Sequence, residues 1–185
     1  MEKLMTTTQE TKILCDDMKK LHQSIEEQLD NLEKDTNITS KSNFMIAQNW
    51  ESINSILGLS AVIISGIVTI LGAMTALKGM EDVQHIFNFA STILASIITV
   101  VGSILTFLKP SERAGRYREF GNKQKALRNR IRIYRNVILA QEKYTSIAIE
   151  KLEEFNKDKD TLNSDNPPIS LSVYLKIKKE IKPSE

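Results

Sequence analysis

Hydrophobic residues are gathered into two long uncharged runs in the middle of this chain. The first extends from Ser52 to Leu77 and the second from Val83 to Leu108, with only three charged residues between them. A helix of about 20 residues crosses a hydrocarbon layer of about 30 Å, and both runs are longer than that. The pattern predicts transmembrane helices at about 53–77 and 85–108, joined by a tight turn.

A buried hairpin inside a water-soluble helical bundle is the alternative explanation of the two runs. Such a bundle, for example a toxin that conceals its hairpin until triggered, needs a shell of other helices around both runs. The remaining amphipathic segments are too few to supply that shell. We therefore expect an all-α integral membrane protein built on a two-helix transmembrane hairpin.

The charges that flank the runs predict the orientation of the protein. The segment from Lys109 to Arg135 holds ten Lys or Arg and two acidic residues, whereas the connecting turn holds one Lys and two acids. Positively charged flanks stay in the cytoplasm, so both termini are expected there. The basic residues nearest the membrane are candidates for fixing the topology and for contacting anionic lipid. They are Lys109, Arg113, Arg116 and Arg118.

Two other roles for the basic segment stay open at this point. A site for a phosphate-bearing ligand is one, although Arg128, Arg130, Arg132 and Arg135 do not share one helix face. Nucleic-acid binding is the other, and it is disfavoured because the aromatic residues lie on an apolar stripe and provide no stacking platform.

Before the membrane, apolar residues recur at heptad spacing and predict an N-terminal helix within residues 1–43. The predicted seam consists of Leu14, Met18, Leu21, Ile25, Gln28 and Leu32. The polar stretch Asp35–Asn43 predicts a linker, and Phe44–Trp50 predicts a short helix with Trp50 at the lipid headgroups.

After the membrane, the same spacing predicts one long cytoplasmic amphipathic helix at about 111–157, with Pro110 in its first turn. The predicted stripe consists of Tyr117, Phe120, Gln124, Leu127, Ile131, Tyr134, Ile138, Gln141, Thr145, Ala148, Leu152 and Phe155. Its partner is expected to be the N-terminal helix of the same chain, neighbouring subunits, or both.

Three parts follow from these elements. Residues 1–43 form the N-terminal helix and linker, residues 44–155 the two-transmembrane domain with its cytoplasmic helix, and residues 158–185 a C-terminal tail. Within the tail, Pro167 and Pro168 stop one helix, and a short basic amphipathic helix is expected at Ser170–Ile181.

Both membrane runs place small or polar residues along one face. In the second run this face holds Asn88, Thr92, Ala95, Thr99, Gly102 and Thr106. In the first run its members include Gly58, Ser65 and Gly72. Such faces suit close helix packing, and in an oligomer they also suit the lining of a weakly polar pore. No ionisable residue lies in mid-membrane, so a proton relay is disfavoured.

Residues that carry catalytic or metal chemistry are sparse. Cys15 is the only cysteine and His22 and His85 are the only histidines, a poor set of metal ligands. No Ser-His-Asp order, nucleotide-binding glycine loop or pair of catalytic carboxylates can be placed. We expect neither an enzyme nor a bound cofactor or metal.

The segments "FLKPSERAGRYREF" and "ALRNRIRIYR", which follow two membrane helices joined by a minimal turn, resemble the SLATT family of two-transmembrane effectors. The resemblance covers about Phe44–Phe155. The junction residues that match the family pattern are Phe107, Leu108, Pro110, Glu112, Ala114 and Leu127. Tyr117 stands where the family has a histidine and Gln124 where it has a tyrosine, which argues against transferring a ligand-sensing role to that region.

The resemblance implies a membrane effector that oligomerises into a pore, associated with nucleotide-signal defence systems and also found in large DNA viruses. The leading hypothesis is therefore an effector that forms a pore or permeabilises a membrane. The alternative is a membrane-anchored coiled-coil structural or adaptor protein, which includes viral ones. Expected partners are the lipid bilayer, further copies of the chain, and a nucleotide-signalling or other cytoplasmic protein.

Overall fold

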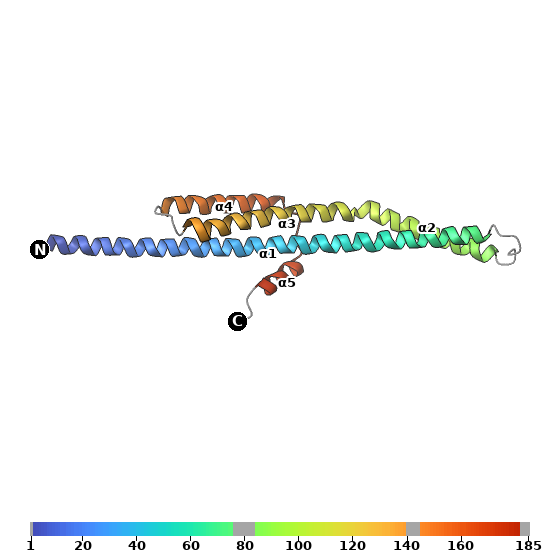
Figure 1. The fold of residues 1–185 in the computed structure, drawn as a ribbon, viewed down its shortest axis with the longest axis horizontal. Helices are drawn as coiled ribbons and strands as arrows, with labels where there is room; N and C mark the ends of the chain where they lie inside the picture. The colour runs from blue at the N-terminus through green and yellow to red at the C-terminus, as the bar shows by residue number, and fades with distance from the viewer. Residues whose placement is uncertain (1, 76–83, 140–144, 182–185) are drawn as a thin grey trace. The chain divides into compact units, whose positions relative to one another are not determined.

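The computed structural model describes residues 2–75, 84–139 and 145–181, and helices occupy nearly all of them. In chain order they are α1 (Glu2–Thr75), α2 (Gln84–Leu108), α3 (Pro110–Ile133), a π-helical segment (Tyr134–Ile138), α4 (Thr145–Asp165) and α5 (Leu171–Ile181), as Figure 1 shows. These ranges contain no strand, so the all-α prediction is confirmed. The predicted turn between the apolar runs lies outside the described residues.

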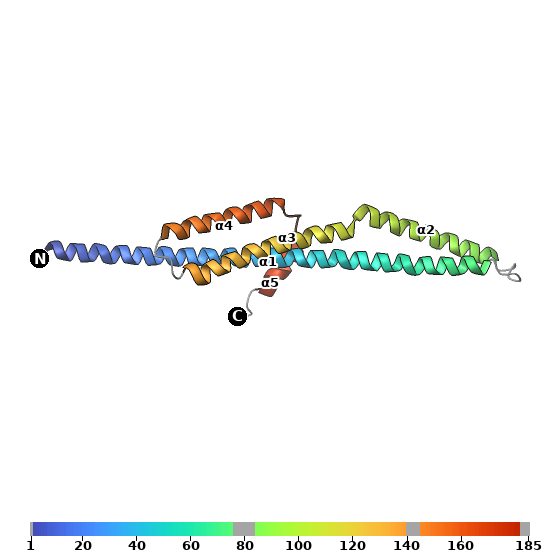
Figure 2. The same ribbon diagram turned by 45° about the horizontal axis from the view of Figure 1, so that its top comes forward.

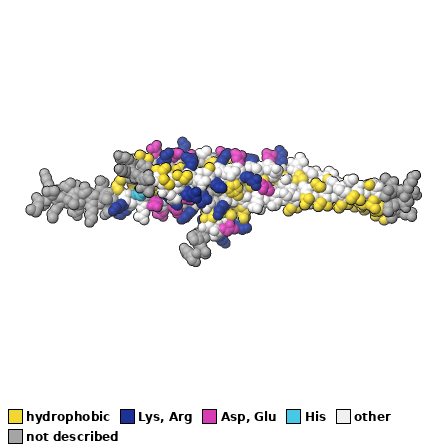
Figure 3. Space-filling view, in the orientation of Figure 1, with side chains coloured by type: hydrophobic (Ala, Val, Ile, Leu, Met, Phe, Trp, Pro, Cys, Tyr) yellow, Lys and Arg dark blue, Asp and Glu magenta, His cyan; other side chains and the backbone are white. Residues whose placement is uncertain are grey.

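The chain divides into two compact units. One comprises residues 1–45 and 117–185 and is called the bundle here, and the other comprises residues 46–116 and is called the apolar unit. Figure 3 shows basic and acidic side chains gathered over the bundle, whereas hydrophobic side chains cover the described ends of α1 and α2. The bundle thus carries the charged surface that suits contact with water, and the apolar unit carries the hydrophobic surface that suits contact with lipid.

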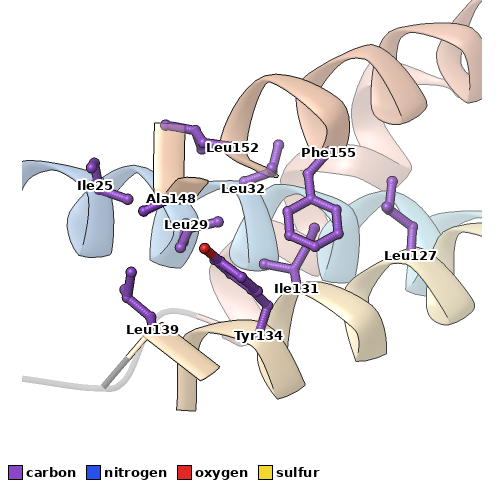
Figure 4. Packing of buried hydrophobic residues seen from close by; sticks show 10 residues of the cluster. All are labelled: Ile25, Leu29, Leu32, Leu127, Ile131, Tyr134, Leu139, Ala148, Leu152 and Phe155. Atoms are coloured by element: carbon purple, nitrogen blue, oxygen red, sulfur yellow. The ribbon is translucent and has the colours of Figure 1, made fainter. Parts of the chain in front are cut away.

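The core of the bundle is formed by three helices, α1, α3 and α4, together with the π-helical segment (Figure 4). Its buried residues are Ile25, Leu29, Leu32, Leu127, Ile131, Tyr134, Leu139, Ala148, Leu152 and Phe155. The rings of Tyr134 and Phe155 meet edge to face, with their centroids 5.7 Å apart. Burial of each Ile, Leu or Phe side chain contributes about 1.5–3 kcal/mol to folding.

The predicted linker at residues 35–43 is wrong, because α1 continues through it without a break. Thr36, Ser40 and Asn43 extend the buried stripe of α1, and each places a polar atom on a carbonyl oxygen. The hydroxyl of Thr36 donates to Leu32 at 2.6 Å, and the amide of Asn43 donates to Thr39 at 3.1 Å. The donors of Thr36, Ser40 and Asn43 are therefore all satisfied. The separate short helix predicted at 44–50 likewise belongs to α1.

The helices α1 and α3 are in close contact at Gly121. The hydroxyl of Ser40 donates to the Gly121 carbonyl at 2.8 Å. A Cβ atom on Gly121 would lie 3.0 Å from Cε1 of the Phe44 ring, so a side chain there would require the ring to shift. Polar and small residues thus set the spacing of the two helices at this level.

A single cytoplasmic helix over 111–157 is also wrong. Tyr134 and Phe155 are 21 residues apart and would be separated by about 30 Å along a straight helix, yet their rings are in contact. The chain therefore turns back, and α4 packs against α3. The π-helical segment adds one residue to the turn, so Leu139 is buried in place of the predicted Ile138, which is exposed.

The N-terminal seam is correct only in part. Ile25 and Leu32 are buried as predicted, but Leu29 occupies the position assigned to Gln28, which is exposed. Met18 and Leu21 are also exposed, so the described core begins at Ile25. The side chain of Leu14 lies outside the described residues. By contrast, α3 begins at Pro110 and α5 covers residues 171–181, which confirms both of those predictions.

Candidate functional site

The apolar unit contains two helices that are long and apolar enough to cross a membrane. The most apolar stretch of each is not buried at all, which is contrary to the buried hairpin of a soluble bundle. The described ends of α1 and α2 lie side by side in both views (Figures 1 and 2), and the Gln84 amide donates to the Thr75 carbonyl at 3.3 Å. Two candidate membrane helices are therefore adjacent at one end.

One face of α2 is half-buried, at strict four-and-three spacing. It consists of Phe87, Ser91, Leu94, Ile98, Val101, Leu105 and Leu108. A matching half-buried face on α1 consists of Asn54, Leu57, Ala61, Ile64, Val68, Leu71 and Thr75. This spacing keeps one side of a helix turned toward a neighbour along its whole length. Each of the two helices thus has one partly covered face.

The predicted small and polar face of α2 lies elsewhere. Asn88, Thr92, Ala95, Thr99, Gly102 and Thr106 are all exposed. On α1, Ser65 and Gly72 are exposed and Gly58 is half-buried. A Cβ atom on Gly58, Gly72 or Gly102 would meet nothing within 4 Å, so no close approach inside this unit requires these glycines. The small and polar face of α2 is therefore exposed in a single chain.

Two serines that the sequence prediction missed complete this surface. Thr92, Ser96, Thr99, Ser103 and Thr106 follow each other at four-and-three spacing and are all exposed. At 100° per residue they fall within an arc of about 80° opposite the half-buried face. We call these five residues the hydroxyl face. The spacing of the hydroxyls themselves, rather than of small residues, is the sequence signal that would have identified it.

Each hydroxyl of this face donates to the carbonyl four residues earlier in its own helix. The distances are 2.8–2.9 Å for Thr92, Ser96, Thr99, Ser103 and Thr106. No donor is left without an acceptor, which is required wherever a surface faces hydrocarbon. Each oxygen retains a lone pair that a second chain or a water molecule can use.

The remaining face of α2 is large and apolar. It consists of Ile86, Phe89, Ile93, Ile97, Val100, Ile104 and Phe107, all exposed. We call these residues the lipid face, because contiguous exposed side chains of this size are stable only in an apolar environment. The helix thus has three faces: one half-buried, one of hydroxyls and one of large apolar side chains.

The junction between α2 and α3 is a sharp break at Lys109. This residue has φ of 44°, a left-handed conformation that costs a non-glycine residue about 1–2 kcal/mol. Its N–H donates to the Leu105 carbonyl at 3.0 Å and closes α2, while its carbonyl accepts from Arg113 at 3.1 Å and opens α3. Pro110 is buried at the first position of α3, where its missing N–H has no consequence.

The four predicted membrane-proximal cations are all exposed. Lys109 pairs with Glu112 at 3.4 Å, and the Arg113 guanidinium lies 4.9 Å from the centroid of the Trp50 ring. Arg113 and Trp50 bring a cation and an amphipathic ring together at the end of the apolar unit, as at a membrane surface.

The arginines farther along the chain, in α3 and in the π-helical segment, have a different role. Arg135 pairs with Asp30 and with Glu33 at 3.2 Å, and Arg130 pairs with Glu154 at 2.8 Å and with Asp158 at 2.7 Å. The Arg135 pairs connect the π-helical segment to α1, and the Arg130 pairs connect α3 to α4. They stabilise the bundle, so they argue against a phosphate pocket made of these arginines.

Electrostatic effects on carboxyl groups in the bundle are local. A hydrogen bond from Lys34 is the largest cause of the lowered pKa of Asp30, and Arg135 lowers it further against the opposing effect of burial. A hydrogen bond from Lys151 similarly lowers the pKa of Glu154. Both groups are therefore ionised and paired at neutral pH.

The two departures from the family pattern have structural roles in the bundle. The Tyr117 hydroxyl donates to the Pro168 carbonyl at 2.9 Å and holds the segment before α5. The amide of Gln124, which is fully buried, donates to Asn163 at 3.1 Å and connects α3 to α4. Within the described ranges, no group of three His, Cys, Asp or Glu could hold a metal ion.

A family model described as the SMODS and SLOG-associating 2TM effector domain, in its fungal SLATT form, matches residues 36–165. That range includes both apolar helices together with α3 and α4. It confirms the resemblance found over residues 44–155 and leaves α5 outside. Comparisons with curated proteins and with solved structures found no match.

Proposed function

The chain belongs to the SLATT family of two-transmembrane effector domains, and we propose that it acts by pore formation or permeabilisation of a membrane. In this proposal several copies associate through the hydroxyl face of α2. The single observation that supports it is that this face is exposed in one chain while its hydroxyl donors are all satisfied internally.

Each of the three faces of α2 makes a different contact in such an assembly. The half-buried face holds α1, and the lipid face meets the acyl chains. The hydroxyl face remains for neighbouring copies or for water, since small side chains let helices approach and hydroxyl oxygens accept hydrogen bonds. A lumen lined in this way is weakly polar and uncharged, so conduction would be poorly selective.

Both termini are proposed to lie in the cytoplasm. Ile25 and Leu32 of α1 share one core with Ile131 of α3 and Phe155 of α4, so the segments before and after the membrane must be on one side of it. The exposed basic residues after α2 favour the cytoplasmic side. Labelling of Cys15 by a membrane-impermeant thiol reagent in intact and opened cells tests this orientation.

The pore proposal is tested by expressing the chain and recording membrane potential. Depolarisation is expected, and the triple variant Thr92→Val, Thr99→Val, Thr106→Val should alter it because three hydroxyls leave the lining without any change in the contact with α1. The matched control is Ile93→Leu, Ile97→Leu, Ile104→Leu on the lipid face, which should conduct as the natural chain does. An unchanged conductance in the valine variant would remove the hydroxyl face as the lining.

An anchored structural or adaptor protein is the second candidate. The observation that favours it is the bundle itself, which is a folded cytoplasmic unit with its own core and ion pairs. The bundle covers its apolar stripe within one chain, so the adaptor would bind through its surface. A monomer in nanodiscs that leaves the membrane polarised would favour the adaptor, whereas a closed ring would favour the pore.

A cytoplasmic signalling partner is proposed by analogy with the family. The matching family is described as associating with SMODS and SLOG proteins, and the bundle is the part of this chain that could meet a protein of that kind. Co-purification of such a protein with the full chain, and its loss when bundle surface charges are reversed, tests this association.

A further inference from the structure

The short helix α5 is attached to the bundle by one face and presents another apolar face to solvent. Ile177 is 5% exposed, and Tyr174 and Ile181 beside it are partly covered. Leu171 is 71% exposed and Leu175 is 46% exposed. A helix of eleven residues thus has a docked apolar side and a second apolar side that the described chain leaves uncovered.

Lysines lie on both sides of the uncovered leucines. At 100° per residue, Leu175 lies about 40° from Leu171, Lys178 about 20° beyond Leu171, and Lys179 about 40° beyond Leu175. Glu180 lies on the opposite side of the helix from Leu171. Within the described part of the chain, none of the ion pairs involves Lys178 or Lys179. Apolar side chains between two unpaired lysines are typical of helices that lie in a lipid headgroup layer.

The segment before α5 is tied to a residue near the start of α3. The Tyr117 hydroxyl holds the carbonyl of Pro168, and α5 begins three residues later, at Leu171. Tyr117 itself follows Pro110, the first residue after α2 leaves the apolar run, by only seven residues.

We propose that α5 is a membrane-interface helix of this protein. Leu171 and Leu175 enter the headgroup region of a bilayer, and Lys178 and Lys179 contact the phosphates of anionic phospholipids. This assignment is independent of pore formation, and it concerns a segment outside the residues that the family model matches.

A bilayer fits this face better than a second copy of the chain. Two leucines with lysines on both sides form a narrow strip, and the two copies of such a strip would bring four lysines together. Like charges at that separation oppose association, whereas an anionic surface attracts each lysine. Charge complementarity therefore selects anionic lipid.

The test places a spin label on α5 of the full chain in vesicles, in a Cys15→Ser background. One variant carries the label at Leu171→Cys and its matched control at Glu180→Cys, on the opposite side of the helix. In vesicles of phosphatidylcholine with phosphatidylserine, the label at 171 should collide mainly with oxygen, which dissolves in lipid. The label at 180 should collide mainly with an aqueous nickel chelate.

Neutralising the two lysines provides the second measurement. Each lysine near an anionic surface favours the docked state by about fivefold, so Lys178→Gln with Lys179→Gln should lower the docked fraction of the label at 171 strongly. The same loss is expected in vesicles of phosphatidylcholine alone. A label at Val100→Cys on the lipid face of α2 reports insertion of the protein separately.

Three results would overturn the proposal once the Val100 label shows insertion. In the first, the label at 171 collides mainly with the nickel chelate in anionic vesicles. In the second, it is shielded from both reagents, which would mean that protein covers this face. In the third, docking is equal with and without phosphatidylserine and with and without the lysines, which would remove the lysine contacts to lipid phosphate.

Discussion

At the scale of single residues, Gly121 controls how closely α1 and α3 pack. A Cβ atom at position 121 would lie only 3.0 Å from the Phe44 ring, closer than an ordinary van der Waals contact. The Ser40 hydroxyl bonds the carbonyl of the same glycine. A side chain there would separate the helices and break this hydrogen bond.

Gly121→Leu should therefore destabilise the bundle by about 1–3 kcal/mol, the usual cost of overpacking. Thermal unfolding in detergent, followed by circular dichroism, measures this change. Gly115→Leu is the control, because a Cβ atom at Gly115 meets nothing within 4 Å. Adding Phe44→Ala to Gly121→Leu should restore part of the stability, and no restoration would contradict the proposed clash.

Asp30 gives the bundle an acid-sensitive contact. Its ordinary pKa is 3.8, and the Lys34 hydrogen bond, with Arg135, lowers that pKa in the folded chain. A lowered carboxyl pKa contributes stability that is fully present above 3.8 and is lost as the pH falls through the lower, folded pKa.

Unfolding temperature should therefore be insensitive to this group above pH 5 and should fall below about pH 4. Asp30→Asn should lower stability at neutral pH and reduce the decline in acid, because its side chain does not titrate. Unfolding curves of both proteins between neutral and acid pH measure the difference. An identical acid decline in the two proteins would show that Asp30 is not responsible.

At the scale of elements, the apolar helices were predictable and the buried polar stretch of α1 was not. An uncharged stretch of more than 20 residues has few explanations besides a membrane, so the two apolar helices could be predicted from the sequence alone. Thr36, Ser40 and Asn43 suggested a linker because they are small and polar. Thr36 and Asn43 bond carbonyls of α1 itself, whereas Ser40 bonds the carbonyl of Gly121 in α3. Local sequence carries no signal of a partner 81 residues away.

The π-helical segment shows a second limit of sequence periodicity. A heptad count predicts Ile138 in the core, but one added residue in the turn rotates the chain and buries Leu139. The hydroxyl face of α2 was partly predictable because no added residue interrupts the periodicity of that helix. Thr92, Thr99 and Thr106 lie on an unbroken helix, so their spacing alone placed them on one face, although Ser96 and Ser103 were overlooked.

Leu139→Ala should destabilise the bundle by about 2–5 kcal/mol, as expected for a buried leucine. Ile138→Ala, one residue earlier and exposed, should have an effect below about 0.5 kcal/mol. Chemical denaturation of the two variants in detergent compares them directly. Equal losses, or a larger loss for Ile138→Ala, would mean that the helix keeps its regular register.

At the scale of the whole molecule, the two halves of the chain depend on each other. Residues before the first apolar run supply Ile25, Leu29 and Leu32 to a core that is otherwise made of residues after the second run. The segments before the first apolar run and after the second must therefore meet on one side of the membrane before the bundle can fold. Either the chain has already crossed the membrane and returned, or both segments remain on that side until they meet.

Shortening the amino-terminal end should reveal where this dependence begins. Removal of residues 2–20 should leave the unfolding of the bundle nearly unchanged, because Met18 lies outside the core. Removal of residues 2–34 should expose α3 and α4 to proteolysis, since all three core residues of α1 are lost. Limited proteolysis in detergent distinguishes the two. Equal resistance of both truncated chains would contradict the shared core.

The self-bonded hydroxyls of α2 allow one surface to serve in two solvents. Each threonine or serine can turn its proton from a carbonyl of its own helix toward water without any rearrangement of the backbone. In the proposed assembly, a lone chain would lie among acyl tails, and the same surface would become wet when copies associate. A trigger would then need to change only whether neighbouring copies contact the hydroxyl face of α2.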